Sequence, residues 1–305
     1  MDLGKFYKQL AEKQVEPLFR NEPLQKYTTW KIGGPADLLY RPKNFIDCAE
    51  VLRLAKQFHV PVTFLGVGSN VLIADEGIRG LVIQTEGWRE VSWSGQQVTA
   101  GSGILMSTLS RLTAEKGMSG LEFAAGIPGS LGGAVVMNAG AYGCSLAQVI
   151  AGVKTLDLAG ELREYAPAEL ELGYRDSIFK KKKELIVETT LSLKPGNSDE
   201  IKEAMKEYLN TRRAKQPLDL PSAGSVFKNT AQGAGRLIEG VGAKGWRIGD
   251  AQVSEKHANF IVNRGEAKAS EVLALIKEVQ KAVKQEYQVE LKTEVVLLGF
   301  EDTGR

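Results

Sequence analysis

The strongest constraint on the fold of this chain is a stretch from Phe123 to Val153 that contains no charged residue. Its length would allow a helix there to cross a bilayer. The stretch also contains Pro128 and seven glycines, which interrupt a helix and would leave backbone groups without hydrogen bonds in lipid. We therefore predict no membrane span and look for a globular role for this segment.

Two glycine-rich segments indicate places where the backbone meets a large ligand. In the segment 120–143, glycines recur about three residues apart, at Gly126, Gly129, Gly132 and Gly133. Backbone N–H groups at such a place can cradle a pyrophosphate without a cation. The segment GVGSN (66–70) suits an anion-binding turn but lacks both a Walker A lysine and the third Rossmann glycine. A tight strand connection or a packed glycine loop would give the same patterns.

Composition excludes several classes of function. The 39 Lys and Arg residues against 37 Asp and Glu residues leave a net charge of +2, so no global field attracts nucleic acid or an acidic membrane. Two cysteines (Cys48, Cys144) and two histidines (His59, His257) have no zinc-site spacing and form no disulfide framework; we expect no metal. The N-terminus lacks the apolar run of a secretory signal. We expect a cytoplasmic protein with no obligate protein partner.

Hydrophobic periodicity predicts a mixture of helices and strands. Helices are expected over 45–58, over 105–116, from Ser198 onward with Ile201, Met205, Tyr208 and Leu209 on one face, and over 270–287 with Ser270 as the cap. Strands are expected over 60–66, 80–85, 185–193, 259–263 and 291–299, and hairpins over 91–100 and 153–165. The mixture predicts an α+β fold.

The turn-forming residues 194–197 (Lys-Pro-Gly-Asn) indicate a boundary between two domains. We predict an N-terminal helical segment (1–26), a first region (27–194) in two parts (about 27–95 and 96–194), and a C-terminal domain (198–301).

Five motifs in order along the chain resemble one family. They are GVGSN, GLEFAAGIPGSLGGAVVMNAGAYG, YRDSIFK, PSAGSVFKN and LKTEVVLLG. This order is similar to that of the UDP-N-acetylenolpyruvoylglucosamine reductases, and the likeness runs from about Tyr27 to Gly299. The glycine segments alone would indicate only the wider class of FAD proteins. The lack of an extra tyrosine-bearing loop after YRDSIFK resembles the short-loop form, and Thr230 stands where the family commonly has proline.

The resemblance implies an FAD-binding domain of the vanillyl-alcohol-oxidase type over region 27–194 and a smaller α+β substrate-binding domain. It implies non-covalent FAD, reduced by NADPH, and a UDP-sugar enolpyruvyl substrate. The segment 27–38 is similar to the opening flavin-contacting strand. The implied FAD contacts are Tyr27, Gly66, Val67, Gly68, Ser69, Asn70, Gly126, Ile127, Pro128, Gly129, Ser130, Gly132, Gly133, Ala134, Asn138, Ala139 and Gly140.

The implied reaction adds a hydride to the terminal carbon of an enolpyruvyl ether and a proton to the adjacent carbon. The family's catalytic positions correspond to Arg175, Ser225 and Glu294. A guanidinium suits a developing enolate because it offers a fixed fork of donors. The resemblance makes Ser225 the proton donor, and a buried Glu294 in an apolar strand could donate a hydrogen bond or a proton. Without the family, the three would be a surface arginine, a turn serine and an edge carboxylate.

The resemblance places the nucleotide diphosphate near basic residues that follow the helix from Ser198, and a substrate clamp near Tyr142. The implied substrate contacts are Tyr142, Tyr174, Arg213, Lys215, Gln216 and Asn229. A solvated helix end is the alternative for the basic group.

Two other functions stay open at this point. One is an FAD-dependent oxidase of the same flavin fold acting on a small alcohol or sugar. The other is a non-catalytic flavin- or nucleotide-sugar-binding module, which would have no need for Arg175, Ser225 and Glu294.

Overall fold

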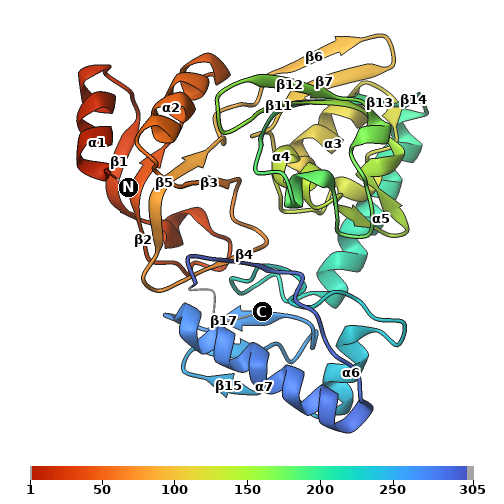
Figure 1. Cartoon of the computed structure of the whole chain (residues 1–305). Coiled ribbons are helices and arrows are strands. Elements are labelled where there is room, and N and C mark those ends of the chain that lie inside the picture. Colours follow the sequence, from red (N-terminus) through yellow and green to blue (C-terminus); the bar gives the residue numbers. More distant parts are fainter. Residues whose placement is uncertain (1, 301–305) are drawn as a thin grey trace. The chain divides into compact units, whose positions relative to one another are not determined.

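The computed structural model describes residues 2–300, which form two compact units (Figure 1). Unit 1 comprises the described residues up to Arg20, together with Leu38–Val67 and Gly80–Thr211. Unit 2 comprises Asn21–Asp37, Gly68–Arg79 and the described residues from Arg212 onward. These boundaries differ from the predicted division at residues 194–198. Most of the helix from Ser198 belongs to unit 1, and two short N-terminal segments belong to unit 2.

The first part of unit 1 contains most of a four-stranded sheet in the order β1-β2-β5-β3, of which residues 21–23, 35–37 and 78–79 belong to unit 2. Apolar helix faces cover this sheet. Its strands are β1 (Leu18–Pro23), β2 (Pro35–Tyr40), β3 (Val62–Leu65) and β5 (Ile78–Gln84), and its helices are α1 (Leu3–Glu12) and α2 (Phe45–Gln57). Strands β3 and β5 run parallel. Helix α2 confirms the predicted helix over 45–58, and its Val51, Leu52 and Ala55 are buried in this core.

The second part of unit 1 is an antiparallel sheet in the order β12-β11-β13-β7-β6. Its strands are β6 (Val91–Ser94), β7 (Gln97–Gly101), β11 (Ile150–Leu156), β12 (Leu162–Tyr165) and β13 (Leu185–Ser192). Both predicted hairpins are confirmed, because β6 pairs with β7 and β11 pairs with β12. The turn of the first hairpin is at Ser94–Gln97, with Gly95 in a left-handed conformation.

Helices and short strands complete this part. The helices are α3 (Met106–Glu115), α4 (Leu131–Val136) and α5 (Ser198–Lys215), with 3-10 turns at η2 (Glu122–Ala124), η3 (Leu146–Gln148), η4 (Pro167–Glu169) and η5 (Ile178–Lys180). The short strands β8 (Met118–Ser119) and β14 (Lys194–Pro195) pair, as do β9 (Gly140–Ala141) and β10 (Cys144–Ser145). Helices α3 and α5 confirm the predicted helices over 105–116 and from Ser198.

The charge-free stretch 123–153 lies within this part of unit 1. Its side chains Phe123, Leu131, Val135 and Leu146 are buried in one hydrophobic core, so the lack of charge reflects burial inside the unit. Over residues 2–300, no helix combines the length and the apolar character that a membrane crossing requires.

Unit 2 is built from a three-stranded antiparallel sheet, a parallel strand pair and two helices. The elements are η1 (Leu24–Tyr27), β4 (Val71–Ile73), α6 (Ala234–Gly240), β15 (Arg247–Ile248), β16 (Ala251–Val253), β17 (Ile261–Asn263), α7 (Ala269–Tyr287) and β18 (Val296–Leu298). The sheet order is β15-β16-β17, and β18 pairs in parallel with β4. Trp30 is fully buried in this core, and its Nε1–H donates to the Ile261 carbonyl at 2.9 Å. These contacts explain why segments 21–37 and 68–79 belong to unit 2.

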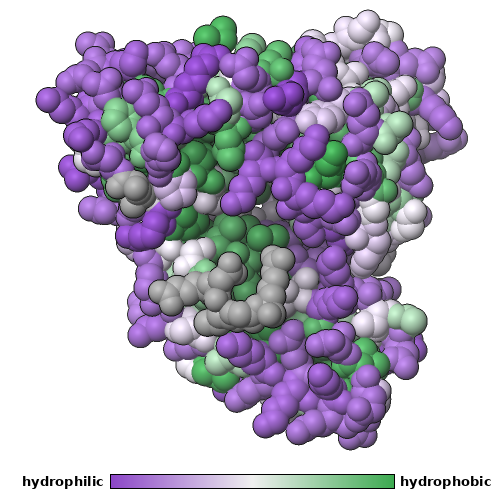
Figure 2. All heavy atoms as spheres, in the orientation of Figure 1, coloured by the Kyte–Doolittle hydropathy of each residue, from purple (hydrophilic) through white to green (hydrophobic). Residues whose placement is uncertain are grey.

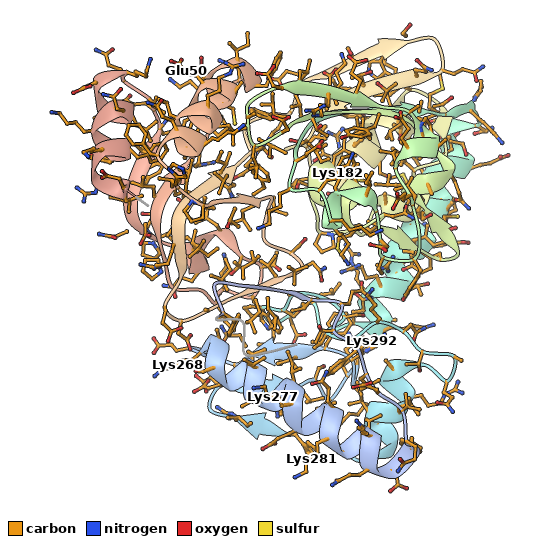
Figure 3. All side chains as sticks on the ribbon, viewed as in Figure 1. Glu50, Lys182, Lys268, Lys277, Lys281 and Lys292 are labelled. Atoms are coloured by element: carbon orange, nitrogen blue, oxygen red, sulfur yellow. The ribbon has the colours of Figure 1, made fainter. Side chains whose placement is uncertain are left out.

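Helix α7 is amphipathic, as the periodicity predicts. Val272, Leu275 and Val279 are buried in the core of unit 2, whereas Lys277 and Lys281 are exposed and are labelled in Figure 3. Figure 2 shows mostly hydrophilic side chains over the face of this helix that is in view. The helix is therefore held to unit 2 by its apolar face.

The start of α7 differs from the prediction. The helix begins at Ala269 after Lys268, so Ser270 is inside the first turn and does not cap it. The Asp75 carboxylate accepts hydrogen bonds from the Ala269 amide at 2.7 Å and the Ser270 amide at 3.0 Å. These amides lack helical partners, and a carboxylate at a helix N-terminus also interacts favourably with the helix dipole. The cap comes from a residue distant in sequence.

One further prediction was wrong. The segment 27–38 is not one strand, because it consists of the end of η1, irregular residues 28–34 and the start of β2.

We predict that Asp75→Ala lowers the free energy of unfolding by about 1 kcal/mol at pH 7, the typical value of a lost helix cap. Burial raises the pKa of Asp75, but hydrogen bonds from the Ser270 and Ala269 amides and the charge of Lys268 outweigh it, so the net pKa is lowered. A lowered folded-state pKa adds stability above the unfolded-state pKa, and this stability is lost as the pH falls through the folded-state pKa. Urea unfolding followed by circular dichroism should show the full difference at pH 7.

The same measurement at about pH 3, below the usual pKa of an aspartate, should show a smaller difference between the two proteins. Glu76→Ala is the control, because it removes a neighbouring exposed carboxylate that makes no hydrogen bond within residues 2–300. An equal loss in both variants, or a loss independent of pH, would contradict the capping role.

Candidate active site

The glycine segments bring backbone from three parts of unit 1 together. A Cβ atom added at Gly66 would lie 2.5 Å from Ser130 Oγ, and one added at Gly132 would lie 2.9 Å from Ser102 Cβ. The Gly132 amide donates to the Ser102 carbonyl at 2.8 Å, and the Met106 amide donates to the Gly129 carbonyl at 2.9 Å. The glycines are therefore required for close backbone approach, which is also the arrangement needed beside a large planar or phosphate-bearing ligand.

One buried polar atom beside this cradle lacks a protein partner. Gln84 donates through Nε2 to the Gly66 carbonyl at 3.3 Å, but its Oε1 is buried and has no partner among residues 2–300. Buried polar groups are normally hydrogen-bonded, so this acceptor fits a cradle whose remaining partners come from a bound cofactor.

The predicted FAD contacts do not all lie in one unit. Gly66, Val67 and the predicted contacts from Gly126 to Gly140 belong to unit 1, whereas Gly68, Ser69, Asn70 and Tyr27 belong to unit 2. At Gly68, with a φ of +61°, an added Cβ would clash with the Tyr27 carbonyl. The second half of GVGSN therefore packs against residues 27–29 of unit 2.

Asn70 and Asn138 are engaged within the protein. Asn70 Nδ2 donates to the Glu294 carbonyl at 3.2 Å, and the Asn70 carbonyl accepts from the Val296 amide at 3.0 Å. Asn138 Nδ2 donates to the Gly173 carbonyl at 2.8 Å, and its Oδ1 accepts from the Ala147 amide at 3.0 Å. Both side-chain amides therefore hold neighbouring segments in place, which the resemblance did not indicate.

Ser225 and Glu294 are brought together in unit 2 by backbone pairing. The Glu294 amide donates to the Val226 carbonyl at 2.8 Å, and the Lys228 amide donates to the Lys292 carbonyl at 2.8 Å. Phe227 and Thr293 form the bridge between these hydrogen bonds. Both Ser225 and Glu294 are half-buried, so Glu294 is less enclosed than its apolar surroundings in the sequence predict.

Asn259, which the sequence analysis missed, lies on the other side of this segment. Its Oδ1 accepts from the Phe227 amide and its Nδ2 donates to the Phe227 carbonyl, each at 2.9 Å. The available signal in the sequence was an asparagine among apolar residues in HANFIV. The structure shows that this asparagine is buried. Nothing local in the sequence indicates its partner.

Arg175 is in unit 1, in an unusual backbone conformation. Its φ is +53°, which is uncommon for a residue other than glycine. Its guanidinium donates to the Gly140 carbonyl at 2.9 Å and lies 5.3 Å from the centre of the Tyr174 ring. Strain of this kind is typical of functional positions. The neighbouring loop, with Asn138 and Tyr142, also contains positive φ values of 40° and 56°.

The predicted substrate contacts fall into three groups. Tyr142 and Tyr174, both exposed, are in unit 1, and the Tyr142 ring stacks on Tyr208 at 4.2 Å while its hydroxyl donates to the Tyr208 carbonyl at 2.8 Å. Arg213 and Lys215 are exposed on the last turn of α5, a position that fits both a diphosphate contact and the alternative of a solvated helix end.

Gln216 and Asn229 form the third group, in unit 2. Gln216 Oε1 is buried without a partner within residues 2–300, and Asn229 Oδ1 accepts from the Ala234 amide at 2.9 Å. The orphaned oxygen of Gln216 leaves an acceptor available to a ligand.

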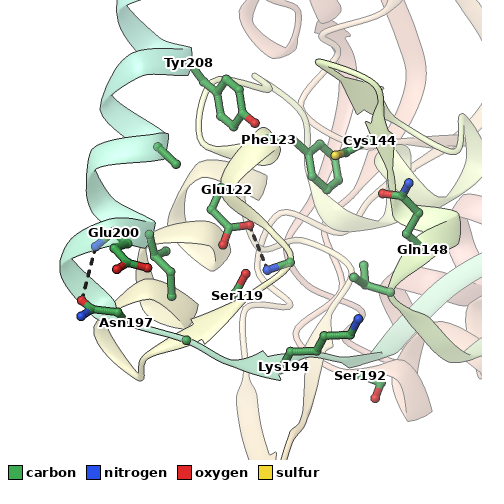
Figure 4. Close-up of a pocket in the computed structure, with 15 residues that line it drawn as sticks. Ser119, Glu122, Phe123, Cys144, Gln148, Ser192, Lys194, Asn197, Glu200 and Tyr208 are labelled. Atoms are coloured by element: carbon green, nitrogen blue, oxygen red, sulfur yellow. Dashed lines mark hydrogen bonds between the residues drawn. The ribbon is translucent and has the colours of Figure 1, made fainter.

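A separate pocket of about 550 Å³ lies in unit 1 (Figure 4). Its walls include Phe123, Cys144, Lys194 and Tyr208, and the Glu122 carboxylate in it accepts from the Gly120 amide at 2.9 Å. None of the predicted site residues lines it. The pocket is therefore distinct from the glycine cradle.

Comparisons with known proteins identify the family. The model of the C-terminal domain of UDP-N-acetylenolpyruvoylglucosamine reductase matches residues 216–298, and an FAD binding domain matches residues 36–166. The chain is 44% identical over 300 residues to the UDP-N-acetylenolpyruvoylglucosamine reductase of Moorella thermoacetica, covering 98% of this chain and 99% of that protein. It is 43% identical over 296 residues to the protein of the same name from Clostridium perfringens strain SM101, covering 96% and 97%.

A solved structure is also similar. The crystal structure of UDP-N-acetylenolpyruvylglucosamine reductase from Thermus caldophilus matches with a TM-score of 0.79 and 34% identity, covering 92% of this chain and 98% of that one. The predicted α+β fold is confirmed, with an FAD-binding domain of the vanillyl-alcohol-oxidase type and a smaller α+β C-terminal domain.

The glycine cradle allows a matched pair of substitutions. Gly132→Ala should lower the free energy of unfolding of the FAD-free protein by about 1–3 kcal/mol, because the new methyl group is forced against Ser102 in a packed region. Gly133→Ala in the same helix should cause no loss and should raise it by up to about 1 kcal/mol, because alanine favours a helix more than glycine does and its Cβ would meet only Ser130 Oγ, at 3.7 Å. Urea unfolding measures both. Equal losses would show that the close approach at Gly132 has no special role.

Proposed function

This chain belongs to the UDP-N-acetylenolpyruvoylglucosamine reductase family, flavoproteins of peptidoglycan synthesis, and we propose from this premise that it is an NADPH-dependent reductase. Its proposed substrate is UDP-N-acetyl-3-O-(1-carboxyvinyl)-glucosamine, and its product is UDP-N-acetylmuramate. The observation that carries the proposal is the pairing in unit 2 that holds Ser225 next to the segment of Glu294, which precedes β18. The oxidase alternative has no comparable support from the relatives.

The glycine cradle supports the FAD part of the proposal. Backbone at Gly66, Val67 and Gly129–Gly133 would hold the cofactor, and the unpartnered Gln84 Oε1 offers an acceptor beside it. Bound FAD would supply the hydride for the terminal carbon of the enolpyruvyl group. The protein then has to bind the negative charge that develops on the adjacent carbon and its carboxylate, and to deliver a proton.

Arg175 is proposed to stabilise the developing enolate. A guanidinium stays charged and offers parallel N–H donors to a carboxylate. The Gly140 carbonyl and the Tyr174 ring restrict the rotation of this side chain. A pre-oriented donor requires little reorganisation when charge develops, which is why such donors are effective in catalysis.

Ser225 is proposed to donate the proton to the carbon next to the carboxylate, with Glu294 donating a hydrogen bond or a proton to the enolate. A serine hydroxyl is a weak acid, so it serves here only because a carbanion is a strong base. The pairing of residues 226–228 with 292–294 supports this assignment, since it places both residues on adjacent backbone segments.

Recognition of the nucleotide diphosphate is proposed for Arg213, Lys215, Gln216 and Asn229, and contact with the sugar for Tyr142 and Tyr174. The positive charges of Arg213 and Lys215 on the last turn of α5 support the first group, and Gln216 would contribute its Nε2–H donors, because phosphate oxygens only accept hydrogen bonds. Tyr142 would have to leave its stack on Tyr208 in order to reach a ligand elsewhere.

Anaerobic absorbance spectra test the proposed function. We expect the bands of oxidised flavin to bleach after one equivalent of NADPH and to return on addition of the enolpyruvyl sugar nucleotide. A protein that takes up no FAD would contradict the flavin assignment. Reoxidation by oxygen but not by this substrate would favour an oxidase.

Ser225→Ala should separate the two half-reactions. Flavin reduction by NADPH should stay within about twofold of the wild-type rate, while reoxidation by the enolpyruvyl substrate should slow by about 10²–10⁴-fold, the usual contribution of a general acid. Stopped-flow absorbance measures each step. Substrate reduction at an undiminished rate would show that the proton comes from another group.

A further inference from the structure

Ser225 lies in a segment whose own conformation does not fix it. Residues 221–229 form no regular strand, and the preceding Gly224 has a φ of +75° with no atom within 4 Å of the position of a Cβ. A chain with a glycine at this point has many conformations available to it. Residues 221 and 222 are held by the Asn263 amide and by Thr29 Oγ1, but Gly224 separates them from Ser225. The placement of the Ser225 hydroxyl therefore also depends on what holds the residues that follow it.

Asn259 holds those residues with three hydrogen bonds. Its carbonyl accepts from the Val226 amide at 2.9 Å, while its side-chain amide accepts from the Phe227 amide and donates to the Phe227 carbonyl. Asn259 and Phe227 are 6% and 2% exposed, so water does not compete for these contacts. A primary amide is suited to this position because it accepts and donates side by side, as a peptide group of a neighbouring strand would.

The other edge of the same segment faces residues 292–294. The Val226 carbonyl accepts from the Glu294 amide, and the Lys228 amide donates to the Lys292 carbonyl. Residues 226–228 are thus held on both sides, by backbone on one side and mainly by one asparagine side chain on the other. Removing the Asn259 side chain would take both partners from the Phe227 backbone groups and leave only the Val226 amide bonded to the Asn259 carbonyl.

Asn259 is itself fixed by the turn that precedes it. Its amide donates to His257 Nδ1 at 3.2 Å, and Ser254 Oγ accepts from the amides of Lys256 and His257. Burial lowers the pKa of His257, which keeps Nδ1 available as an acceptor. The His257 ring also packs edge-on against Phe260, at 4.9 Å between ring centres. The backbone at Asn259 is therefore held in place, so its side chain is positioned to bond to Phe227.

We propose that Asn259 is a positioning residue for Ser225: through the backbone of Val226 and Phe227 it fixes the serine hydroxyl for proton delivery to the substrate. This inference rests on the proposed function, because it requires Ser225 to be the proton donor. Asn259 touches neither substrate nor cofactor in this role. Its effect is on the geometry of one step of the reaction.

The test measures the two half-reactions of Asn259→Asp holoenzyme by stopped-flow absorbance. Aspartate keeps the acceptor for the Phe227 amide and loses the donor to the Phe227 carbonyl. Flavin reduction by NADPH should stay within about twofold of wild type, and reoxidation by the enolpyruvyl sugar nucleotide should slow by about 10- to 100-fold, as expected for a displaced catalytic group. A slowing of both steps by similar factors would overturn the proposal.

A second comparison distinguishes positioning from general damage. In the Ser225→Ala background, Asn259→Asp should slow reoxidation by less than about twofold further, because the group it positions is already absent. Multiplication of the two effects would show that Asn259 acts independently of Ser225, and would overturn the inference.

Asn263→Asp is the matched control. Asn263 is 2% exposed and donates through Nδ2 to the Trp30 carbonyl at 3.1 Å, so it undergoes the same chemical change at a similarly buried site of unit 2. We expect it to lower the melting temperature without slowing reoxidation selectively. A selective slowing by Asn263→Asp equal to that of Asn259→Asp would assign the effect to buried asparagines in general.

Two further outcomes complete the test. Asn259→Ser is used if Asn259→Asp does not fold. If neither variant yields FAD-loaded protein, Asn259 is required for folding, and the proposal is overturned. Failure of the wild-type protein to reoxidise with the enolpyruvyl substrate would instead contradict the proposed function itself.

Discussion

The pairing of residues 226–228 with residues 292–294 is the interaction on which the chemistry of unit 2 depends. It consists of backbone hydrogen bonds only, the shortest at 2.8 Å, and it joins the segment that follows a flexible glycine to the end of the chain. Beyond residues 292–294 the chain enters β18, which pairs in parallel with β4. Strand β4 begins directly after Asn70. Ser225, Glu294 and the second half of GVGSN therefore share one backbone framework, which loop conformation alone would not provide.

Unit 1 meets a different constraint, because backbone segments have to approach closely without leaving polar groups unpaired. Gly66 and Gly132 allow the approach at Ser130 and Ser102. The structure nevertheless leaves Gln84 Oε1 and Thr189 Oγ1 buried without partners within residues 2–300. Such groups destabilise a protein unless something satisfies them. The Gln84 acceptor lies beside the glycine cradle, which agrees with a unit that is completed by its cofactor.

Sequence periodicity predicted the local elements well. The helices α2, α3 and α5 and the hairpins β6–β7 and β11–β12 lie where the patterns place them. The apolar spacing of a helix or a hairpin is a property of neighbouring residues, so it can be recognised without the rest of the chain. The motifs likewise identified the family, since their order along the chain is a property of the sequence. The segment 27–38 failed as a strand because its residues are held by tertiary contacts, such as the buried Trp30.

The sequence by itself determined the residue types and the local elements: a charge-free glycine stretch, an amphipathic C-terminal helix, and the serine, arginine and glutamate of the motifs. Only the tertiary structure decided the partners. Helix α7 is capped by Asp75, which is 194 residues from Ala269 in the sequence, and not by Ser270. The side chains of Asn70 and Asn259 bond to backbone groups of Glu294 and Phe227. A side-chain amide or carboxylate bonds to whichever backbone group lies within about 3 Å, and that proximity exists only once distant segments have packed together.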